Sequence, residues 1–404
     1  MNVKSIALSE VAEFNPPAPA LAADEEVSFV PMAAVSELGV MHVTEHARVA
    51  DLKSGYSYMR TGDVLVAKIT PCFENNKIAV ASLDRPHGYG STEFHVIRPR
   101  KEKLEARFLV HFLRQDQIRT AGERRMTGSA GQRRVPKQFL GELAVPLPPL
   151  DEQRRIAAIL DQADDLRRKR REALGRLEKL SQMLFLAAVG EDNSHPHVKL
   201  SSACELITDG THYTPTYAAK GTIFLSARNV VSGVVDWDNI KFIPDSLHME
   251  LQKRISPRLN DVLLAKNGTT GVAALVDRDL VFDIYVSLAL LRAGSSLLPQ
   301  FLLAALNSPS CKKQFDGALK GIGVPNLHLK DIREAKIPLP PLPLQHAFAA
   351  RVAEIDKLKA HHRAHLARLD ALFACLQHRA FRGDLSAPSF SRAREKAASR
   401  SEVG

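Results

Sequence analysis

Cationic and hydroxyl side chains set among glycines are the residues of this chain best suited to chemistry. Residues 122–137 (GERRMTGSAGQRRVPK) place five lysines and arginines beside small, flexible positions. Glycines let backbone amides approach a phosphate, and arginines contact phosphates or the edges of guanine bases. The segment therefore indicates contact with nucleic acid, and a solvated surface loop is the alternative interpretation.

Two later segments carry similar groups. Residues 208–215 read TDGTHYTP, and residues 266–271 read KNGTTG. The second segment is too short for a phosphate-binding loop and lacks its Gly-Lys-Ser/Thr ending. We interpret it as a turn that presents polar side chains to DNA.

The motifs for catalysis and metal binding are incomplete. Asn15-Pro16-Pro17 is followed by Ala18, whereas the tetrapeptide that grips a flipped adenine in amino-methyltransferases ends in an aromatic residue. His361, His362 and His365 have helical spacing, but no carboxylate or cysteine completes a metal site. The cysteines show no CxxC spacing. We expect no catalytic residue, no metal and no cofactor in this chain.

The charge balance narrows the classes of partner. The chain has 404 residues and a net charge of +10, with a pI near 9.4. Such a balance favours nucleic acid, an anionic membrane surface or acidic partners. No apolar stretch approaches the roughly 18 residues of a membrane span, and residues 1–10 lack a signal-peptide core. We therefore expect a soluble, cytoplasmic protein.

A repeat divides the chain into related halves. The string PLPPL at residues 146–150 recurs at residues 338–342, which is 192 positions later. Shorter matches lie between the two strings: DVLVAK at 63–68 with DVLLAK at 261–266, and Val135-Pro136 and Leu140 with Val324-Pro325 and Leu329. A period near half the chain is too long for a solenoid. The repeat predicts two copies of one unit, each a domain followed by a long helix.

The residue patterns within each half predict an α+β domain with a curled sheet. The predicted strands lie at 62–69, 78–83, 260–266 and 280–291, and the predicted amphipathic helices lie at 108–118 and 300–307.

A coiled-coil pattern follows each PLPPL string. Ile156, Ala163, Leu177 and Leu184 fall on one heptad position, and the same position 192 residues later holds a similar set. The second apolar position is expected three residues further on, at Ile159, Leu166, Ala173, Leu180 and Ala187 and at Arg351, Leu358, His365, Leu372 and Arg379. Because such a helix is not stable alone, we expect the two helices to pair as an antiparallel coiled coil with pseudo-twofold symmetry.

The predicted organisation has two related target-recognition domains, each followed by a spacer helix. The boundaries are 1–145 for the first domain, 146–195 for the first helix, 196–337 for the second domain, 338–385 for the second helix and 386–404 for a disordered tail.

Cationic, hydroxyl and amide side chains of the polar segments are expected to face DNA. In the first domain they are Lys68, Thr70, Arg124, Arg125, Gln132, Arg133, Arg134 and Lys137. In the second domain they are His212, Thr214, Arg228, Lys266, Asn267, Thr269, Thr270 and Lys320.

Several of these segments resemble one known family. TDGTHYTP, KNGTTG, GSAGQRRVP at 128–136 and the helix starts after PLPPL are similar to the DNA-specificity subunit of type I restriction-modification systems. The resemblance implies that each domain reads one half of a split DNA site and that the helices set the gap between halves. It also implies methyltransferase subunits that dock on the helices and bring S-adenosylmethionine, and a translocating nuclease subunit that can join them.

Two other classes of function stay open at this point. A DNA methyltransferase in its own right would need a cofactor motif, and methyl transfer by the isolated chain would reveal it. A coiled-coil protein-binding adaptor would explain the helices without the basic segment, and salt-sensitive DNA binding separates it from a DNA-recognition subunit.

Overall fold

The computed structural model describes residues 4–42, 45–129, 131–190, 195–319 and 325–385. The chain forms two compact units: unit 1 holds residues 1–172 and 364–404, and unit 2 holds residues 173–363. Each long helix therefore contributes one part to each unit. The predicted disordered tail lies outside the described residues.

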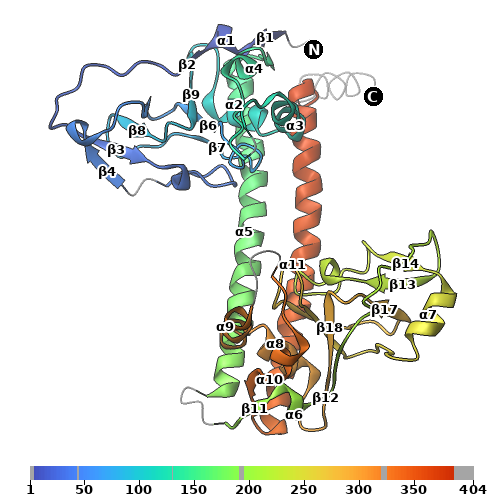
Figure 1. Cartoon of the computed structure of the whole chain (residues 1–404). Helices are drawn as coiled ribbons and strands as arrows, with labels where there is room; N and C mark the ends of the chain where they lie inside the picture. Colours follow the sequence, from blue (N-terminus) through green and yellow to red (C-terminus); the bar gives the residue numbers. More distant parts are fainter. Residues whose placement is uncertain (1–3, 43–44, 130, 191–194, 320–324, 386–404) are drawn as a thin grey trace, which may run out of the picture. The chain divides into compact units, whose positions relative to one another are not determined.

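Unit 1 contains small sheets and short helices that lead into a long helix (Figure 1). Its strands and helices are β1 (Ser5–Ala7), α1 (Leu8–Val11), β2 (Ala12–Phe14), β3 (Glu26–Val30), β4 (Glu45–Arg48), β5 (Ser57–Met59), β6 (Val64–Ala67), β7 (Ile78–Val80), β8 (Gly88–Gly90), β9 (Phe94–Pro99), α2 (Ala106–Leu113), α3 (Asp116–Arg125), α4 (Lys137–Gly141), β10 (Ala144–Pro146) and the first part of α5 (Leu150–Val189). In the described residues, these strands form the sheets β2-β9-β6-β7 and β4-β3-β8-β5 and the pair β1-β10. Strands β3 and β8 are parallel.

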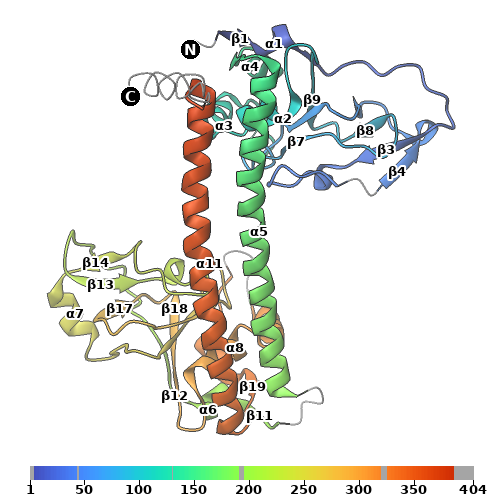
Figure 2. The ribbon, with the colours of Figure 1, turned by 180° about the vertical axis from the view of Figure 1, so that it is seen from behind.

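Unit 2 follows the same order except that helix α7 stands where unit 1 has strand β5 (Figure 2). Its strands and helices are β11 (His197–Lys199), α6 (Leu200–Ala203), β12 (Cys204–Asp209), β13 (Thr222–Leu225), β14 (Lys241–Ile243), α7 (Asp245–Leu251), β15 (Val262–Ala265), β16 (Ala273–Leu275), β17 (Phe282–Ile284), β18 (Leu288–Ala293), α8 (Pro299–Leu306), α9 (Pro309–Ala318), α10 (Leu329–Glu334), β19 (Lys336–Pro338) and the first part of α11 (Leu342–Arg382). The sheets are β12-β18-β15-β16 and β14-β13-β17, with the pair β11-β19, in the part of the chain that the structure describes. The parallel pair β13 and β17 matches β3 and β8.

The equivalent central strands explain why each unit folds as it does. All residues of β6 and of β15 are buried, as expected for short apolar strands inside a sheet. Asp63 accepts two hydrogen bonds from Arg98, and Asp261 accepts two from Arg292. The internal repeat therefore extends to buried ion pairs.

Hydrogen bonds correct one part of the repeat alignment. The Val135 amide donates to the Lys68 carbonyl, and the Leu327 amide donates to the Lys266 carbonyl. Since Lys68 and Lys266 both follow the matched strands, Val135 corresponds to Leu327. The predicted match of Val135 with Val324 is wrong by three residues, because a shared Val-Pro pair is weaker evidence than a shared strand partner.

Two predicted elements are divided in the structure. The predicted strand at 280–291 consists of β17 and β18 with a turn between them, and the Leu288 amide donates to the Tyr285 carbonyl in that turn. The predicted helix at 108–118 spans the end of α2 and the start of α3, and Gln115 is the N-cap of α3. Apolar periodicity alone did not indicate these breaks.

The long helices pack against each other within each unit, and they run antiparallel. In unit 1, Arg167 Nε lies 2.6 Å from Asp370 Oδ1, and Arg155 donates to the Leu385 carbonyl. In unit 2, Lys359 Nζ lies 2.8 Å from Glu178 Oε2, and the Phe185 and Phe348 rings are 6.0 Å apart. Later residues of α5 therefore contact earlier residues of α11.

The second position of the helical seam differs from the prediction. The side chains four residues after the first set are all buried or half-buried, at Leu160, Arg167, Leu174, Ser181 and Ala188 and at Val352, Lys359, Leu366, Phe373 and Ala380. The predicted positions three residues on include Leu166, Leu180, Leu358 and Leu372, which are 43–51% exposed. The prediction was wrong because leucines occupy the outer positions, while Arg167 and Lys359 occupy the inner ones.

A buried glutamine fixes the start of each long helix to its own domain. Gln153 is fully buried and bonds to the Glu105 amide and to the Lys103 and Pro148 carbonyls. Gln345 is fully buried in unit 2 and bonds to the Leu298 amide and to the Ser296 and Pro340 carbonyls. Both helix starts therefore share the same hydrogen bonds, from one buried glutamine to one amide and two carbonyls, although their neighbouring residues differ.

Candidate nucleic-acid interface

In unit 1, the basic segment crosses the end of strand β6. The Thr70 amide donates to the Arg133 carbonyl at 2.9 Å, and Arg134 pairs with Thr127 in a short bridge. These contacts bring Lys68 and Thr70 next to residues 132–135. Arg124 and Arg125 are exposed at the end of α3, just before Thr127. Most of the predicted cations of this domain therefore gather in one region.

Carboxylates within this region hold some of its cations. Arg134 donates to Glu93 from Nε and Nη2, at 2.9 and 2.7 Å. Arg133 lies 3.9 Å from Glu74, which accepts a 2.8 Å hydrogen bond from Thr70. The hydrogen bond from Arg134 keeps the pKa of Glu93 below its usual value, so Glu93 stays charged and offsets Arg134.

A buried histidine lies beneath the same cations. His95 bonds to the Val135 carbonyl at 2.9 Å. Burial lowers the pKa of His95, and the charges of Lys68 and Lys137 act in the same direction. The neutral ring is therefore a structural support for the segment, and Lys68 and Lys137 supply positive charge near it.

In unit 2, the corresponding lysine is buried, whereas Lys68 of unit 1 is half-buried. Lys266 follows β15, and its ammonium group lies 2.7 Å from Asp209 Oδ2. Arg254 Nη2 and His212 Nε2 lie 3.0 and 3.4 Å from Asp209 Oδ1. Burial alone would raise the pKa of Asp209, but Lys266, Arg254 and His212 lower it below its usual value. Lys266 therefore supports the loop at Asp209 from inside the domain.

The other predicted side chains of unit 2 lie around this strand end or on nearby turns. His212, Thr214, Arg228 and Thr269 are exposed, and Asn267 and Thr270 are half-buried. Asn267 pairs with Asn326 in a short bridge, and among the described residues neither Oδ1 atom has a hydrogen-bond partner. Gln132 of unit 1 is exposed. Lys320 lies outside the described residues.

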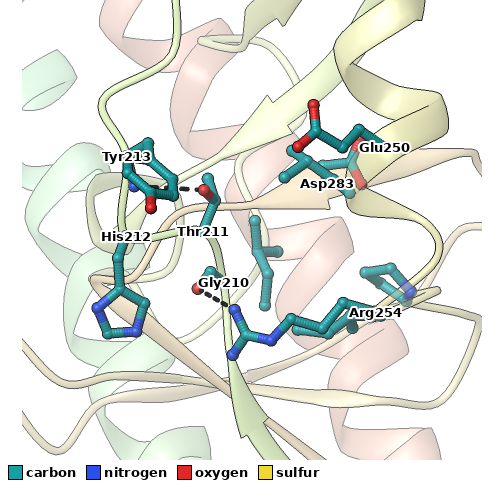
Figure 3. A pocket seen from close by; sticks show the side chains of 11 residues that line it. Gly210, Thr211, His212, Tyr213, Glu250, Arg254 and Asp283 are labelled. Atoms are coloured by element: carbon teal, nitrogen blue, oxygen red, sulfur yellow. Dashed lines mark hydrogen bonds between the residues drawn. The ribbon is translucent and has the colours of Figure 1, made fainter.

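A pocket of about 440 Å³ opens beside the loop that follows β12 (Figure 3). Gly210, Thr211, His212 and Tyr213 form one side, Arg254 forms another, and Glu250 and Asp283 line the wall near α7. Asp283 lies 2.8 Å from His248, and burial raises the pKa of Asp283 against the opposing effect of that histidine. The pocket thus has a cationic side and an acidic side.

Three residues of this region were not among the predicted side chains: Asp209, Tyr213 and Arg254. Asp209 and Tyr213 lie within TDGTHYTP, so the string was noticed without these positions being selected. Arg254 lies 45 positions after Asp209, and no sequence signal connects the two. In the described residues, no cluster of three or more metal-ligating side chains is found, and no helix is long and apolar enough to cross a membrane.

Comparisons with known proteins agree on one family. Residues 2–176 and 213–370 match the family model described as "Type I restriction modification DNA specificity domain". The EcoAI specificity subunit of Escherichia coli is 41% identical over 151 residues, which are 37% of this chain and 26% of that subunit. The EcoEI specificity subunit of the same species is 34% identical over 195 residues, which are 47% of this chain and 33% of that subunit. The chain therefore matches about a quarter to a third of these relatives.

A solved structure supports the same fold. The type I restriction-modification S subunit from M. genitalium superposes with a TM-score of 0.55 at 14% identity, and the match covers 94% of this chain and 96% of that one.

Proposed function

The chain belongs to the family of type I restriction modification DNA specificity domains, and from this premise we propose that it is the DNA-recognition subunit of a type I restriction-modification complex. Each unit would read one half of a bipartite double-stranded DNA site. The complex would act on DNA in the cytoplasm.

One observation carries this proposal: the chain repeats one framework with different exposed side chains. Both units join a later segment to the residue that follows a buried central strand, through the Val135–Lys68 and Leu327–Lys266 hydrogen bonds. Unit 1 adds exposed arginines there, whereas unit 2 buries its lysine on Asp209. A common framework with different side chains suits two different half-sites.

A bipartite site follows from linking two readers in one polypeptide. When one unit has bound, the second contact becomes intramolecular, so two modest affinities combine into a high one. The gain is lost when the half-sites lie at the wrong separation. The proposal therefore includes a fixed, unread gap between the half-sites.

Methyl transfer and DNA cleavage are assigned in this proposal to partner subunits. S-adenosylmethionine would be bound by the methyltransferase subunits, and restriction subunits could join them. Asn15 supports the assignment, since its Oδ1 accepts a 2.9 Å hydrogen bond from the Val96 amide. Its side chain is part of the sheet framework and does not grip a base.

The long helices offer surfaces for the methyltransferase subunits. Leu166, Leu180, Leu358 and Leu372 are each more than two-fifths exposed. These leucines lie outside the seam that joins the helices, and large exposed apolar patches mark protein–protein contact surfaces. We assign the docking of methyltransferase subunits to these outer leucines.

The test is DNA binding by the chain assembled with its methyltransferase partner. Duplexes carrying the methylated motif should bind with strong salt dependence, and deletion of this chain should abolish methylation in the host. Methylation that continues without the chain would refute the proposal. Salt-insensitive binding would favour the protein-binding adaptor instead.

A further inference from the structure

Tyr213 is the most exposed large hydrophobic side chain in the described part of the chain, with 85% of its surface open to solvent. It follows β12 in the second domain, on the loop that borders the pocket (Figure 3). A tyrosine ring combines a large apolar face with a polar tip, and such residues are enriched at binding surfaces. Its exposure therefore requires an explanation.

The backbone that carries Tyr213 is held in place. A Cβ atom on Gly210 would lie 2.0 Å from the Ile284 carbonyl oxygen, so the chain can pass here only as glycine. The Thr211 amide donates to the Ile284 carbonyl, and the Val286 amide donates to the Thr211 carbonyl. The loop is thus fixed to strand β17 just before the exposed ring.

Side chains brace the same loop from both ends. Arg254 donates to the Gly210 and Asp209 carbonyls. The Tyr213 amide donates to Thr211 Oγ1 at 3.3 Å, and Thr214 Oγ1 lies 3.4 Å from Tyr285 Oη. A ring on so fixed a support loses little conformational entropy when it binds a partner.

The surroundings of the ring suit DNA. His212 is exposed beside it, and Lys241 Nζ lies 4.0 Å from the centre of the Tyr217 ring on the same loop. On duplex DNA, cations contact phosphates and apolar groups contact base edges in the grooves. In unit 1, the corresponding strand β2 ends where the Asn15 amide donates a hydrogen bond to the Val96 carbonyl. The residues that follow, 16–21 (PPAPAL), include no aromatic residue.

We propose that Tyr213 is a specificity-determining residue of the second domain, whose ring packs against bases of one half-site. This inference rests on the proposed function and names one residue that would determine its DNA specificity. The first domain, which has no equivalent ring, must read its half-site by other contacts.

The test compares Tyr213→Ala and Tyr213→Phe in the full chain assembled with its methyltransferase partner. Adenine methylation is mapped on a library of DNA sites in which every position of both half-sites varies. Tyr213→Ala should lower discrimination roughly tenfold at one or more positions of one half-site and leave the other half-site unchanged. Tyr213→Phe should retain the wild-type motif because the ring is kept.

The outcomes separate the two proposals. An unchanged motif for Tyr213→Ala, or equal weakening at every site, would overturn the role of Tyr213 in specificity while leaving the DNA-recognition function intact. A wild-type complex that gives no bipartite motif would overturn the proposed function and this inference together. An unchanged melting temperature for Tyr213→Ala will show that the loss of specificity is not a loss of folding.

Discussion

At the scale of single residues, Asp209 and Lys266 show that a residue in a segment predicted to bind DNA can have a structural role. The Lys266 ammonium is buried, and Asp209 neutralises it at 2.7 Å. Removing one partner of a buried pair leaves an uncompensated charge, which is strongly destabilising. Lys266 thus stabilises the loop that positions His212 and Tyr213.

The variant Asp209→Asn should destabilise unit 2 by about 3 kcal/mol at pH 7. Because the partners lower the pKa of Asp209 in the folded protein, its contribution is present above the unfolded value of about 3.9 and is lost as the pH falls through the lower folded pKa. Urea unfolding at pH 7 and below about pH 4 will measure this. A penalty equally large at both pH values would contradict the role of the carboxylate charge.

Arg133 and Arg134 are neighbours with different expected effects on DNA binding. Arg133→Ala should flatten the salt dependence of binding by about one unit of slope, because this side chain is exposed. Arg134→Ala should change the slope less, since Glu93 already offsets its charge. The measurement is Kd against salt concentration, with the exposed Arg154→Ala on α5 as the control.

At the scale of elements, the buried glutamines join each long helix to its domain. Replacing Gln153 by Leu removes a group that bonds to one amide and two carbonyls. Buried polar groups left without partners each cost about 1–3 kcal/mol. The same loss follows in unit 2 from Gln345→Leu.

Gln153→Leu should therefore destabilise unit 1 by about 3 kcal/mol, and Gln345→Leu should do the same to unit 2. Hydrogen exchange measured by mass spectrometry will show whether each variant loses stability only in its own unit. Gln162→Leu is the matched control because Gln162 is an exposed residue of the same helix. Equal effects of Gln153→Leu and Gln162→Leu would show that the hydrogen bonds of Gln153 do not fix the helix start to its domain.

The outer leucines of the helices should matter for assembly and not for folding. Leu180→Lys and Leu358→Lys should weaken co-purification of the methyltransferase subunit at least tenfold, because each places a charge on the proposed apolar docking surface. Ala360→Lys, at another exposed position of α11, serves as the control. Normal assembly by both leucine variants would place docking elsewhere.

Sequence reasoning predicted the repeated framework better than the side chains that complete the site. The PLPPL strings and the central strands were recognisable from the sequence because prolines and apolar runs determine the conformation of the residues next to them. The helical seam was misjudged because Leu166 and Leu180 look like core residues, whereas the half-buried Arg167 does not. Pairing of Arg254 with Asp209 depends on tertiary folding, and no local pattern indicates it.

At the scale of the whole molecule, the chain repeats one domain design with two different surfaces. The basic segment of unit 1 is rich in exposed arginine, whereas the loop of unit 2 presents Tyr213 and His212 on a braced support. The two surfaces should therefore recognise different half-sites.

The most direct test of this central claim is an exchange of domains followed by mapping of methylated adenines in host DNA. Residues 1–145 or residues 196–337 would be replaced by the equivalent residues of a relative with another target. We predict a bipartite methylated motif in which each exchange changes one half and leaves the other half unchanged. A motif that changes in both halves with either exchange, or that does not depend on this chain, would contradict the proposal.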